Sequence, residues 1–97
     1  MKNTFILLIV SGLAACAGDN QGSFPLTYQA FETHLHASMD YPAIVRNFGE
    51  PAKDIGSGIH IYVYELPDGT EIWIGYADEI KYALHLGKNR QLLHTIL

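Results

Sequence analysis

The chain has little of three features that mark common classes of protein. It has one cysteine, which excludes an internal disulfide, so the folded part must be stabilised by packing alone. Lys and Arg number 6 against 10 Asp and Glu, without a basic cluster, which disfavours nucleic acid and anionic lipid headgroups as partners. No apolar run reaches the roughly 20 residues that span a bilayer.

The first fifteen residues have the layout of a secretory signal. Lys2 places a positive charge ahead of an apolar run at 5–10, which is too short to be a transmembrane helix. The run leads to Leu13-Ala14-Ala15-Cys16. Small side chains before the cysteine let a peptidase draw an extended backbone into a narrow site beside the bilayer. We therefore expect removal of residues 1–15.

The segment 13–16 resembles the lipobox of bacterial lipoproteins. In that family the cysteine thiol receives diacylglycerol, the preceding peptide is cut away and the new amino group is acylated. The resemblance implies that Cys16 is a membrane anchor and not a catalytic thiol, because two or more acyl chains give stable attachment. Ala17 is compatible with sorting to the outer membrane, since the family's inner-membrane signal is aspartate there. We expect a cell-envelope lipoprotein on the periplasmic or the surface side.

The rest of the chain divides into a tether and one domain. Residues 16–23 are small and polar, which is typical of a flexible tether. Residues 24–97 suffice for one modest core and no second domain. Loss of residues 1–15 removes Lys2 and so moves the net charge from -4 to -5. We therefore expect an acidic domain held at a membrane through its lipid.

Two short helices are expected first. Thr27 can cap a helix whose apolar residues fall at helical spacing. These residues are Tyr28, Phe31 and Leu35. A second apolar stripe consists of Ile44, Val45 and Phe48. Gly49 and Pro51 end it, and it starts at Asp40 by capping chemistry or at Pro42, which disfavours a helical residue before it.

A β meander is expected next, after a linker at 53–58. The apolar period becomes two, and we predict strands at 59–66, 70–76, 80–86 and 91–96. The turn at 66–69 contains Pro67 and Gly69, suits a type I turn with a glycine bulge, and places Tyr64 opposite Ile72. The sequence therefore predicts an α+β domain with two N-terminal helices packed on one face of a three- to four-stranded antiparallel meander.

The turn lengths assign the strand residues to two faces. The face toward the helices is expected to hold Tyr62, Tyr64, Leu66, Ile72, Ile74, Tyr76, Ile80, Tyr82, Leu84 and Leu86. Phe48, Tyr64, Ile74 and Leu84 are expected to be buried where the helices meet the sheet. The opposite face is expected to hold Ile59, Ile61, Val63 and Trp73 among Glu65, Glu71, Lys81, Ala83 and His85. A sheet covered on one side should alternate apolar with polar residues, and strand 59–66 does not.

That opposite face is the candidate site. Either the tether, a C-terminal strand or a second copy covers it, or it binds another protein. Large aromatic residues in apolar patches often dominate binding energy. We therefore expect contacts with a protein partner from Trp73, Ile61, Val63 and His85.

One segment also resembles a family. It comprises Met39-Asp40-Tyr41, then Val45, then Phe48-Gly49-Glu50-Pro51. It is similar to the Gly-Met-Thr-x-x-x-Val-x-x-x-Leu-Gly-x-Pro signature of the SmpA/OmlA (BamE-like) outer-membrane lipoproteins and of β-lactamase-inhibitor-protein-like domains. The segment 56–64 also resembles small, uncharacterised lipoproteins with a Gly-Ser-Gly-Ile/Leu-x-Ile-Tyr-Val-Tyr run. These resemblances imply two helices on a meander and a protein-binding role, in envelope assembly or as an inhibitor.

The sequence contains no pattern typical of an enzyme or a metal centre. His34 and His36 are two apart and would point to nearly opposite sides of a helix. His85 with Asp78 or Glu79 would need a nucleophile that no motif supplies. The loop 56–58 precedes a strand, whereas phosphate loops precede a helix. We expect no enzyme, cofactor or metal; a small-ligand or glycan-binding module is the alternative to a protein-binding role.

Overall fold

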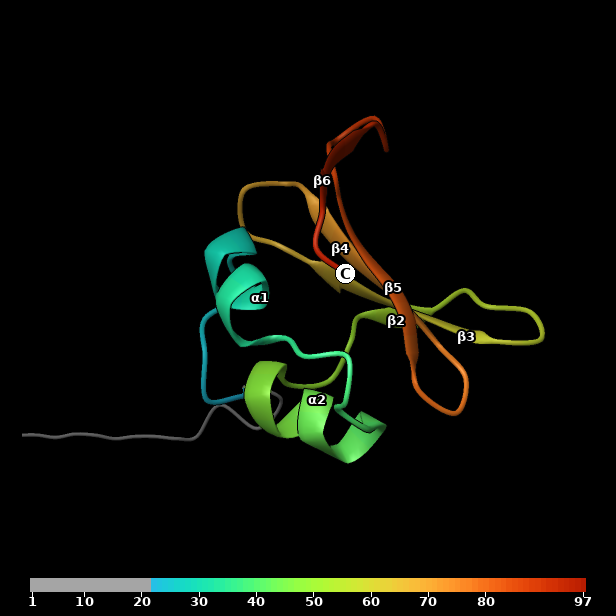
Figure 1. Ribbon diagram of the computed structural model, residues 1–97. Helices are drawn as coiled ribbons and strands as arrows, with labels where there is room; N and C mark the ends of the chain where they lie inside the picture. The colour runs from blue at the N-terminus through green and yellow to red at the C-terminus, as the bar shows by residue number, and fades with distance from the viewer. Residues whose placement is uncertain (1–21) are drawn as a thin grey trace, which may run out of the picture.

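The computed structural model describes residues 22–97, so the expected signal peptide and the Cys16 anchor lie outside the described residues. Two helices precede a sheet: α1 Tyr28–His34, α2 Tyr41–Phe48, β2 Lys53–Asp54, β3 His60–Glu65, β4 Glu71–Tyr76, β5 Ile80–Leu86 and β6 Leu92–Thr95. The strands form one sheet in the order β2-β3-β4-β5-β6, each antiparallel to the next. Both helices lie on the same side of this sheet (Figure 1). The α+β class is confirmed.

The sheet has five strands, not three or four, because β2 forms where a linker is predicted. Lys53 pairs with Val63 and Asp54 pairs with Tyr62. Both β2 residues are exposed, so no alternation of apolar and polar residues marks this strand in the sequence. The β2–β3 hairpin is stabilised by the Asp54 side chain. Its carboxylate accepts the backbone N–H groups of Gly56 at 3.0 Å and Ile61 at 2.9 Å.

The helix ends follow the capping chemistry. The Thr27 hydroxyl accepts the backbone N–H of Ala30 at 3.1 Å, which confirms it as the cap of α1. Asp40 caps α2 through the N–H of Ala43 at 3.0 Å, and α2 begins before Pro42, which lies in the first turn where a missing N–H costs nothing. Gly49 ends α2 with φ 86°, a conformation that favours glycine.

The core lies between the two helices and the near side of the sheet. Its fully covered members include Phe31 and Ile44 from the helices and Ile72 and Ile74 from β4, each at 0% exposure. Phe31 stacks on Phe48 with ring centroids 4.1 Å apart. The predicted burial of Phe48, Tyr64 and Ile74 is confirmed, whereas that of Leu84 is wrong, because Leu84 is half-buried on the other side of the sheet.

Tyr64 is the buried polar link between sheet and helices. Its hydroxyl donates to the Gly49 carbonyl at 2.7 Å, just beyond the end of α2. Burial raises the pKa of Tyr64, so the phenol stays protonated and remains a donor. The turn 66–69 places Tyr64 opposite Ile72, and Gly69 adopts φ 90°, both as predicted.

The predicted register of β5 is wrong by one residue. A β-bulge between Gly75 and Tyr76 pairs Tyr76 with Ile80 but Gly75 with Tyr82, which leaves Lys81 as the extra residue. Ile80 therefore faces the helices as expected, while the residues after Lys81 are inverted. Tyr82, Leu84 and Leu86 face away from the helices, whereas Ala83 and His85 face them, because Ala83 pairs with Ile74 and His85 with Ile72.

Candidate functional site: an uncovered sheet face and a histidine cluster

The sheet has an apolar side that the helices do not cover. We call this side the outer face and define it by six side chains: Ile61, Val63, Trp73, Tyr82, Leu84 and Leu86. One row of paired residues crosses all five strands on this face, namely Lys53, Val63, Trp73, Leu84 and Thr95. β6 extends the sheet at its edge and does not lie over the outer face, so the C-terminal strand is not its cover.

The outer-face side chains pack against one another. Val63 is 0% exposed although it lies outside the core cluster, and its register partners in the row are Lys53 and Trp73. Tyr82 lies across Gly75 on the adjacent strand, where any larger side chain would collide with its ring. Trp73 and Leu84 pair directly and are each half-buried. The outer face is therefore a single layer of apolar side chains on the sheet.

Polar groups at one end of the outer face fix the orientation of Trp73. The indole Nε1 donates to the Glu71 carboxylate at 2.8 Å. The Arg90 guanidinium lies 5.5 Å from the indole ring centroid, within the range of a cation–π interaction. Arg90 Nε also lies 3.9 Å from Glu71 Oε1, so the three side chains form one cluster. A fixed indole loses little conformational freedom when it binds a partner.

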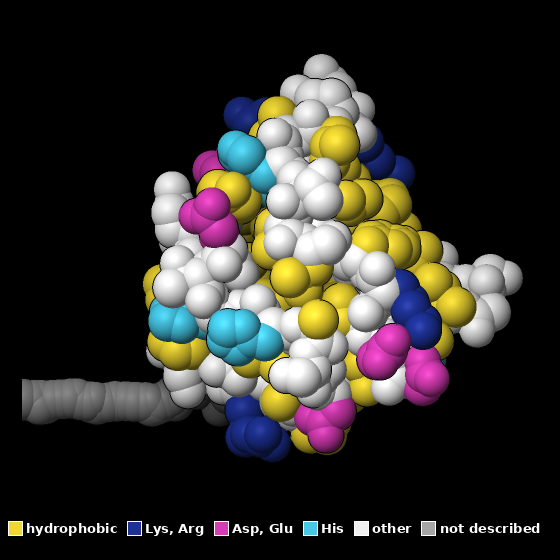
Figure 2. Space-filling model, viewed as in Figure 1, with side chains coloured by type: hydrophobic (Ala, Val, Ile, Leu, Met, Phe, Trp, Pro, Cys, Tyr) yellow, Lys and Arg dark blue, Asp and Glu magenta, His cyan; other side chains and the backbone are white. Residues whose placement is uncertain are grey.

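Charged residues border the apolar surface. Glu65 and Glu71 lie directly opposite each other on β3 and β4, a repulsive arrangement that their basic partners offset. Lys53 reaches Glu65 at 3.9 Å, and Arg90 reaches Glu71. Figure 2 shows hydrophobic side chains along the right-hand side of the molecule, with basic side chains above them and acidic and basic side chains below. An apolar centre with a charged rim is typical of a protein interface.

The β2–β3 hairpin extends this surface away from the body of the domain (Figure 1). Its loop carries Ile55 at 43% exposure and Ile59 at 37% exposure. Ile59 precedes β3 by one residue and, by alternation, shares the side of Ile61 and Val63. The protruding loop therefore adds exposed apolar groups next to the outer face.

The structure shows where the four predicted partner residues lie. Trp73 and Ile61 lie half-buried on the outer face, as expected. Val63 lies there too but is fully covered, so it supports its neighbours and offers no surface of its own. His85 lies on the opposite side, beside α1, because the β5 bulge inverts its direction. The prediction that His85 lies on the same sheet face as Trp73 is wrong.

His85 instead belongs to a polar cluster between α1, the 66–69 turn and β6. The Asp68 carboxylate accepts the Thr70 hydroxyl at 2.6 Å and the Thr70 N–H at 2.9 Å. His85 Nε2 lies 2.9 Å from the same Thr70 oxygen, and His85 Nδ1 lies 3.0 Å from His94 Nδ1. The Tyr28 ring stacks on both imidazoles, with centroids 4.7 Å from His85 and 4.1 Å from His94.

The surroundings shift the ionisation of two members of this cluster. Burial, followed by the nearby His94, lowers the pKa of His85, while Asp68 raises it to a lesser extent. The hydroxyl of Thr70 and then its N–H lower the pKa of Asp68, so this carboxyl is charged at neutral pH. The cluster thus consists of a carboxylate, a hydroxyl and two imidazoles that share protons.

Two pockets lie beside the 66–69 turn. One, of about 360 Å³, is lined by Leu26, Thr27, Tyr28, Gln29, Pro67, Asp68, His85 and His94. The other, of about 410 Å³, has mostly apolar walls that include Phe24, Leu26, Phe48 and Pro67. They share Leu26 and Pro67, so the two hollows adjoin.

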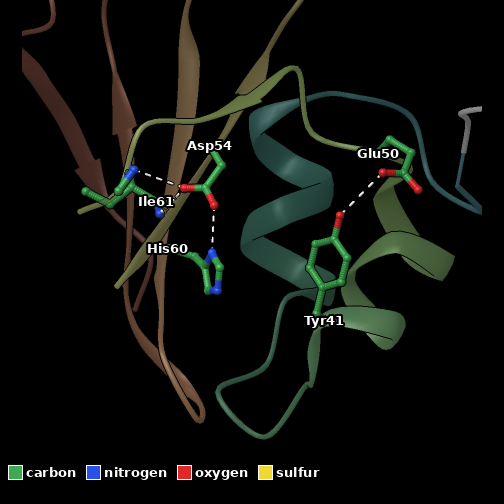
Figure 3. A network of polar contacts seen from close by, with 6 residues as sticks. Tyr41, Glu50, Asp54, His60 and Ile61 are labelled. Atoms are coloured by element: carbon green, nitrogen blue, oxygen red, sulfur yellow. Dashed lines mark hydrogen bonds and ion pairs between the residues drawn. The ribbon is translucent and has the colours of Figure 1, made fainter. Parts of the chain in front are cut away.

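A second polar network lies on the helix-covered side of the sheet, near β2 and the start of β3 (Figure 3). His60 Nδ1 lies 2.7 Å from Asp54 Oδ2, and the Tyr41 hydroxyl points to the Glu50 carboxylate at 3.3 Å. The N–H of Gly56, then His60, then the N–H of Ile61 lower the pKa of Asp54. Since Asp54 closes the β2–β3 hairpin through these same bonds, its role here is to hold the exposed loop.

No cluster of three or more potential metal-binding side chains is present within residues 22–97. Over the same residues, no helix has the length and hydrophobicity to cross a membrane. No protein-family model, no curated protein and no solved structure matches this chain. The site must therefore be interpreted from its own residues.

The sequence contained signals for only part of these sites. The unbroken apolar run in β3 and the turn at 66–69 located the outer face. The histidine cluster joins residues from α1, a turn and two strands, 66 positions apart at its extremes, and no local motif links them. The predicted turn at 87–90 would oppose His85 to Leu92, and His94 lies opposite His85 only because the β5–β6 register shifts between His85 and Leu86.

Proposed function

We propose that this chain is a lipid-anchored cell-envelope protein that binds another protein through its outer face and acts without catalysis. The observation that supports the proposal is the apolar row from Val63 through Trp73 to Leu84 on the side of the sheet away from the helices, in which Trp73 and Leu84 are partly exposed. An apolar row on the side of a sheet opposite the helices has no role in the core, and exposed apolar patches mark interaction sites. The partner belongs to envelope assembly or is an enzyme that the domain inhibits, as the family resemblance implies.

The partner's surface follows from the chemistry of the outer face. It needs an apolar patch for Trp73, Leu84 and Ile61, bordered by groups that can meet Glu65 and Glu71. The exposed isoleucines of the β2–β3 loop would enter a groove beside that patch. A carboxylate-rich partner is disfavoured, because the chain is itself acidic, with a net charge of -4.

The pockets beside the 66–69 turn favour a second candidate function. Two imidazoles and a carboxylate converge on the 360 Å³ hollow, and apolar walls continue into its neighbour. Such a combination suits a small ligand with one polar end. Under this alternative, adding the ligand would shift the NMR signals of His85 and His94 and leave the Trp73 indole signal unchanged.

Site-specific photo-crosslinking tests the main proposal. A photoreactive side chain at Ile61 or Leu84 should yield one and the same adduct in intact cells, because these positions lie on one surface. The matched control positions are the exposed Glu32 and Thr33 on α1, which should not yield this adduct. Equal labelling from α1 and the outer face, or no adduct from either outer position, would argue against the outer face as the interface.

Replacing Cys16 by serine tests the anchor. The hydroxyl of serine cannot form the thioether that holds diacylglycerol, so Cys16→Ser should leave uncleaved precursor or a protein without lipid. Membrane fractionation should show loss of stable attachment, since a large number of buried methylenes is removed at about 0.8 kcal/mol each. Mass spectrometry of the wild type should show the lipid on Cys16. Normal membrane retention of an unacylated Cys16→Ser protein would contradict the anchor.

A further inference from the structure

The two Nδ1 atoms of His85 and His94 can hold only one proton between them if they are to form a hydrogen bond. The Thr70 hydroxyl has a single proton, and its 2.6 Å contact directs that proton to the Asp68 carboxylate. Thr70 Oγ1 therefore accepts the Nε2–H of His85. The Nδ1 of neutral His85 is then an acceptor, and it takes the Nδ1–H of His94 at 3.0 Å. The hydrogens along this chain all point from His94 toward Asp68.

The first added proton fits this arrangement. His94 is exposed, so its Nε2 can take up a proton from solvent while its Nδ1–H still donates to His85. A second proton would have to bind His85 Nδ1. Two N–H groups would then face each other across 3.0 Å, on parallel rings with centroids 5.2 Å apart and like charges. The second protonation therefore destroys the hydrogen bond and adds repulsion.

These imidazoles hold β6 against the rest of the domain. All four residues of β6 are exposed, so the strand itself buries little apolar surface. His94 is the β6 residue that stacks on Tyr28 of α1 and bonds to His85 of β5. Beyond the strand, Ile96 is partly buried against the core and donates its N–H to the Ala83 carbonyl at 2.8 Å. The other ties between β6 and β5 are backbone hydrogen bonds, in the ladder and between Ala83 and residues 96–97, so His94 supplies the side-chain hydrogen bond that joins the two strands.

We propose that the His85–His94 pair is a proton-controlled latch, which holds β6 on β5 at neutral pH and releases it when both imidazoles are charged. Release makes β5 the edge of the sheet, with unpaired backbone groups next to Leu84 and Leu86. Such an edge accepts an extended strand from another chain. The link between this release and a larger partner-binding surface rests on the proposed function. The release of β6 does not.

Other charged groups around the pair determine the direction of the effect. Asp68 faces His85 through Thr70 and favours its charged form, but Lys88 lies against the same turn and offsets part of that attraction. Glu32 accepts the Tyr28 hydroxyl at 3.2 Å and lies beyond the ring that covers both imidazoles. Histidine is the side-chain type in this cluster whose ordinary pKa lies between pH 5 and 8.

The direction in which pH changes the docking of β6 follows from how many protons His85 binds in the docked and in the released state. With β6 docked, burial and then His94 lower the pKa of His85 below its ordinary value of 6.5. With β6 released, His85 returns toward that value and binds more protons. Docking is therefore fully favoured above about pH 6.5 and weakens as the pH falls below it.

Hydrogen–deuterium exchange of the complete chain tests the latch without any partner. Protection factors, corrected for the intrinsic pH dependence of exchange, are compared at about pH 7.5 and about pH 5.5. Amides of residues 92–97 should lose protection at the lower pH, by at most about tenfold, the limit that one proton on His85 sets one pH unit below its ordinary value. Amides of β3 and β4 should keep theirs. His94→Gln should reduce the pH dependence, because it removes the facing imidazole while the burial of His85 remains, and His36→Gln, at an exposed site between the helices, should preserve it in full.

A histidine titration by NMR decides the case in which His94→Gln leaves β6 unprotected at both pH values. The wild type should titrate in two separated steps, because the first charge on the pair opposes the second. Two independent titrations at the ordinary histidine value would overturn the latch. So would unchanged protection of residues 92–97 at low pH, an undiminished loss of protection in His94→Gln, or a loss spread equally over β3 and β4.

Discussion

Replacing Ile74 by alanine should lower the free energy of unfolding by about 2 to 5 kcal/mol, the range for large-to-small changes in a packed core. Ile74 is 0% exposed in the centre of β4, between Tyr62 on β3 and Ala83 on β5. A domain this small has little stability to spare, so the variant should be partly unfolded at moderate temperature. Equilibrium urea unfolding followed by circular dichroism measures the change.

Leu84→Ala is the matched control for Ile74→Ala. Both residues are aliphatic and lie on adjacent central strands, but Leu84 is half-buried on the outer face. Its truncation should cost only about 1 kcal/mol, because less apolar surface is lost and solvent can fill the space. Equal losses in the two variants would contradict the β5 bulge and restore the register in which both side chains face the helices.

Turn and cap residues predict the fold well where the local sequence alone determines the backbone. Pro67 and Gly69 specify the turn that sets the β3–β4 register, and Thr27 and Asp40 specify the starts of the helices. Each of these signals depends on neighbouring residues, so it is visible in the sequence. The α+β class, four of the five strands and most of the core could therefore be predicted.

The register of β5 could not be predicted in this way, because a bulge adds one residue without a marker of its own. Lys81 is charged and lies after a short acidic loop, where it is compatible with either register. Its ion pairs with Asp78 at 3.1 Å and Glu79 at 3.6 Å hold it outside the ladder. A single inserted residue exchanges the two faces of the strand. That exchange moved His85 to the helix side and brought Leu84 to the candidate site.

The exchange also changes the balance between core and interface. Moving three large apolar residues of β5 outward leaves Ala83 and His85 against the helices, and Tyr28 fills the space over His85. The inner face thereby gains the polar cluster that joins α1, β5 and β6. The outer face gains Tyr82 and Leu84 beside Trp73. One backbone irregularity thus creates both candidate sites.

Trp73→Ala should weaken capture of the partner by at least about 30-fold, which corresponds to about 2 kcal/mol. Trp73 lies at the middle of the cross-strand row, and its indole is already oriented by Glu71 and Arg90. Its truncation removes the largest apolar group of the outer face and frees the two charged side chains that hold it. Because the indole is half-buried and outside the core, the free energy of unfolding should fall by only about 1 kcal/mol.

Measuring both quantities on the same variants separates an interface from a structural role. Trp73→Phe should keep much of the apolar contact but lose the 2.8 Å bond to Glu71, so its affinity should lie between those of the wild type and Trp73→Ala. Tyr41→Ala removes a partly exposed aromatic ring on the helix side and should leave capture unchanged. If Trp73 were a core residue, its alanine variant would lower the melting temperature sharply, and capture would fall only as far as the folded fraction falls. A stable Trp73→Ala protein that retains the crosslinked partner at full affinity would exclude the outer face as the binding surface.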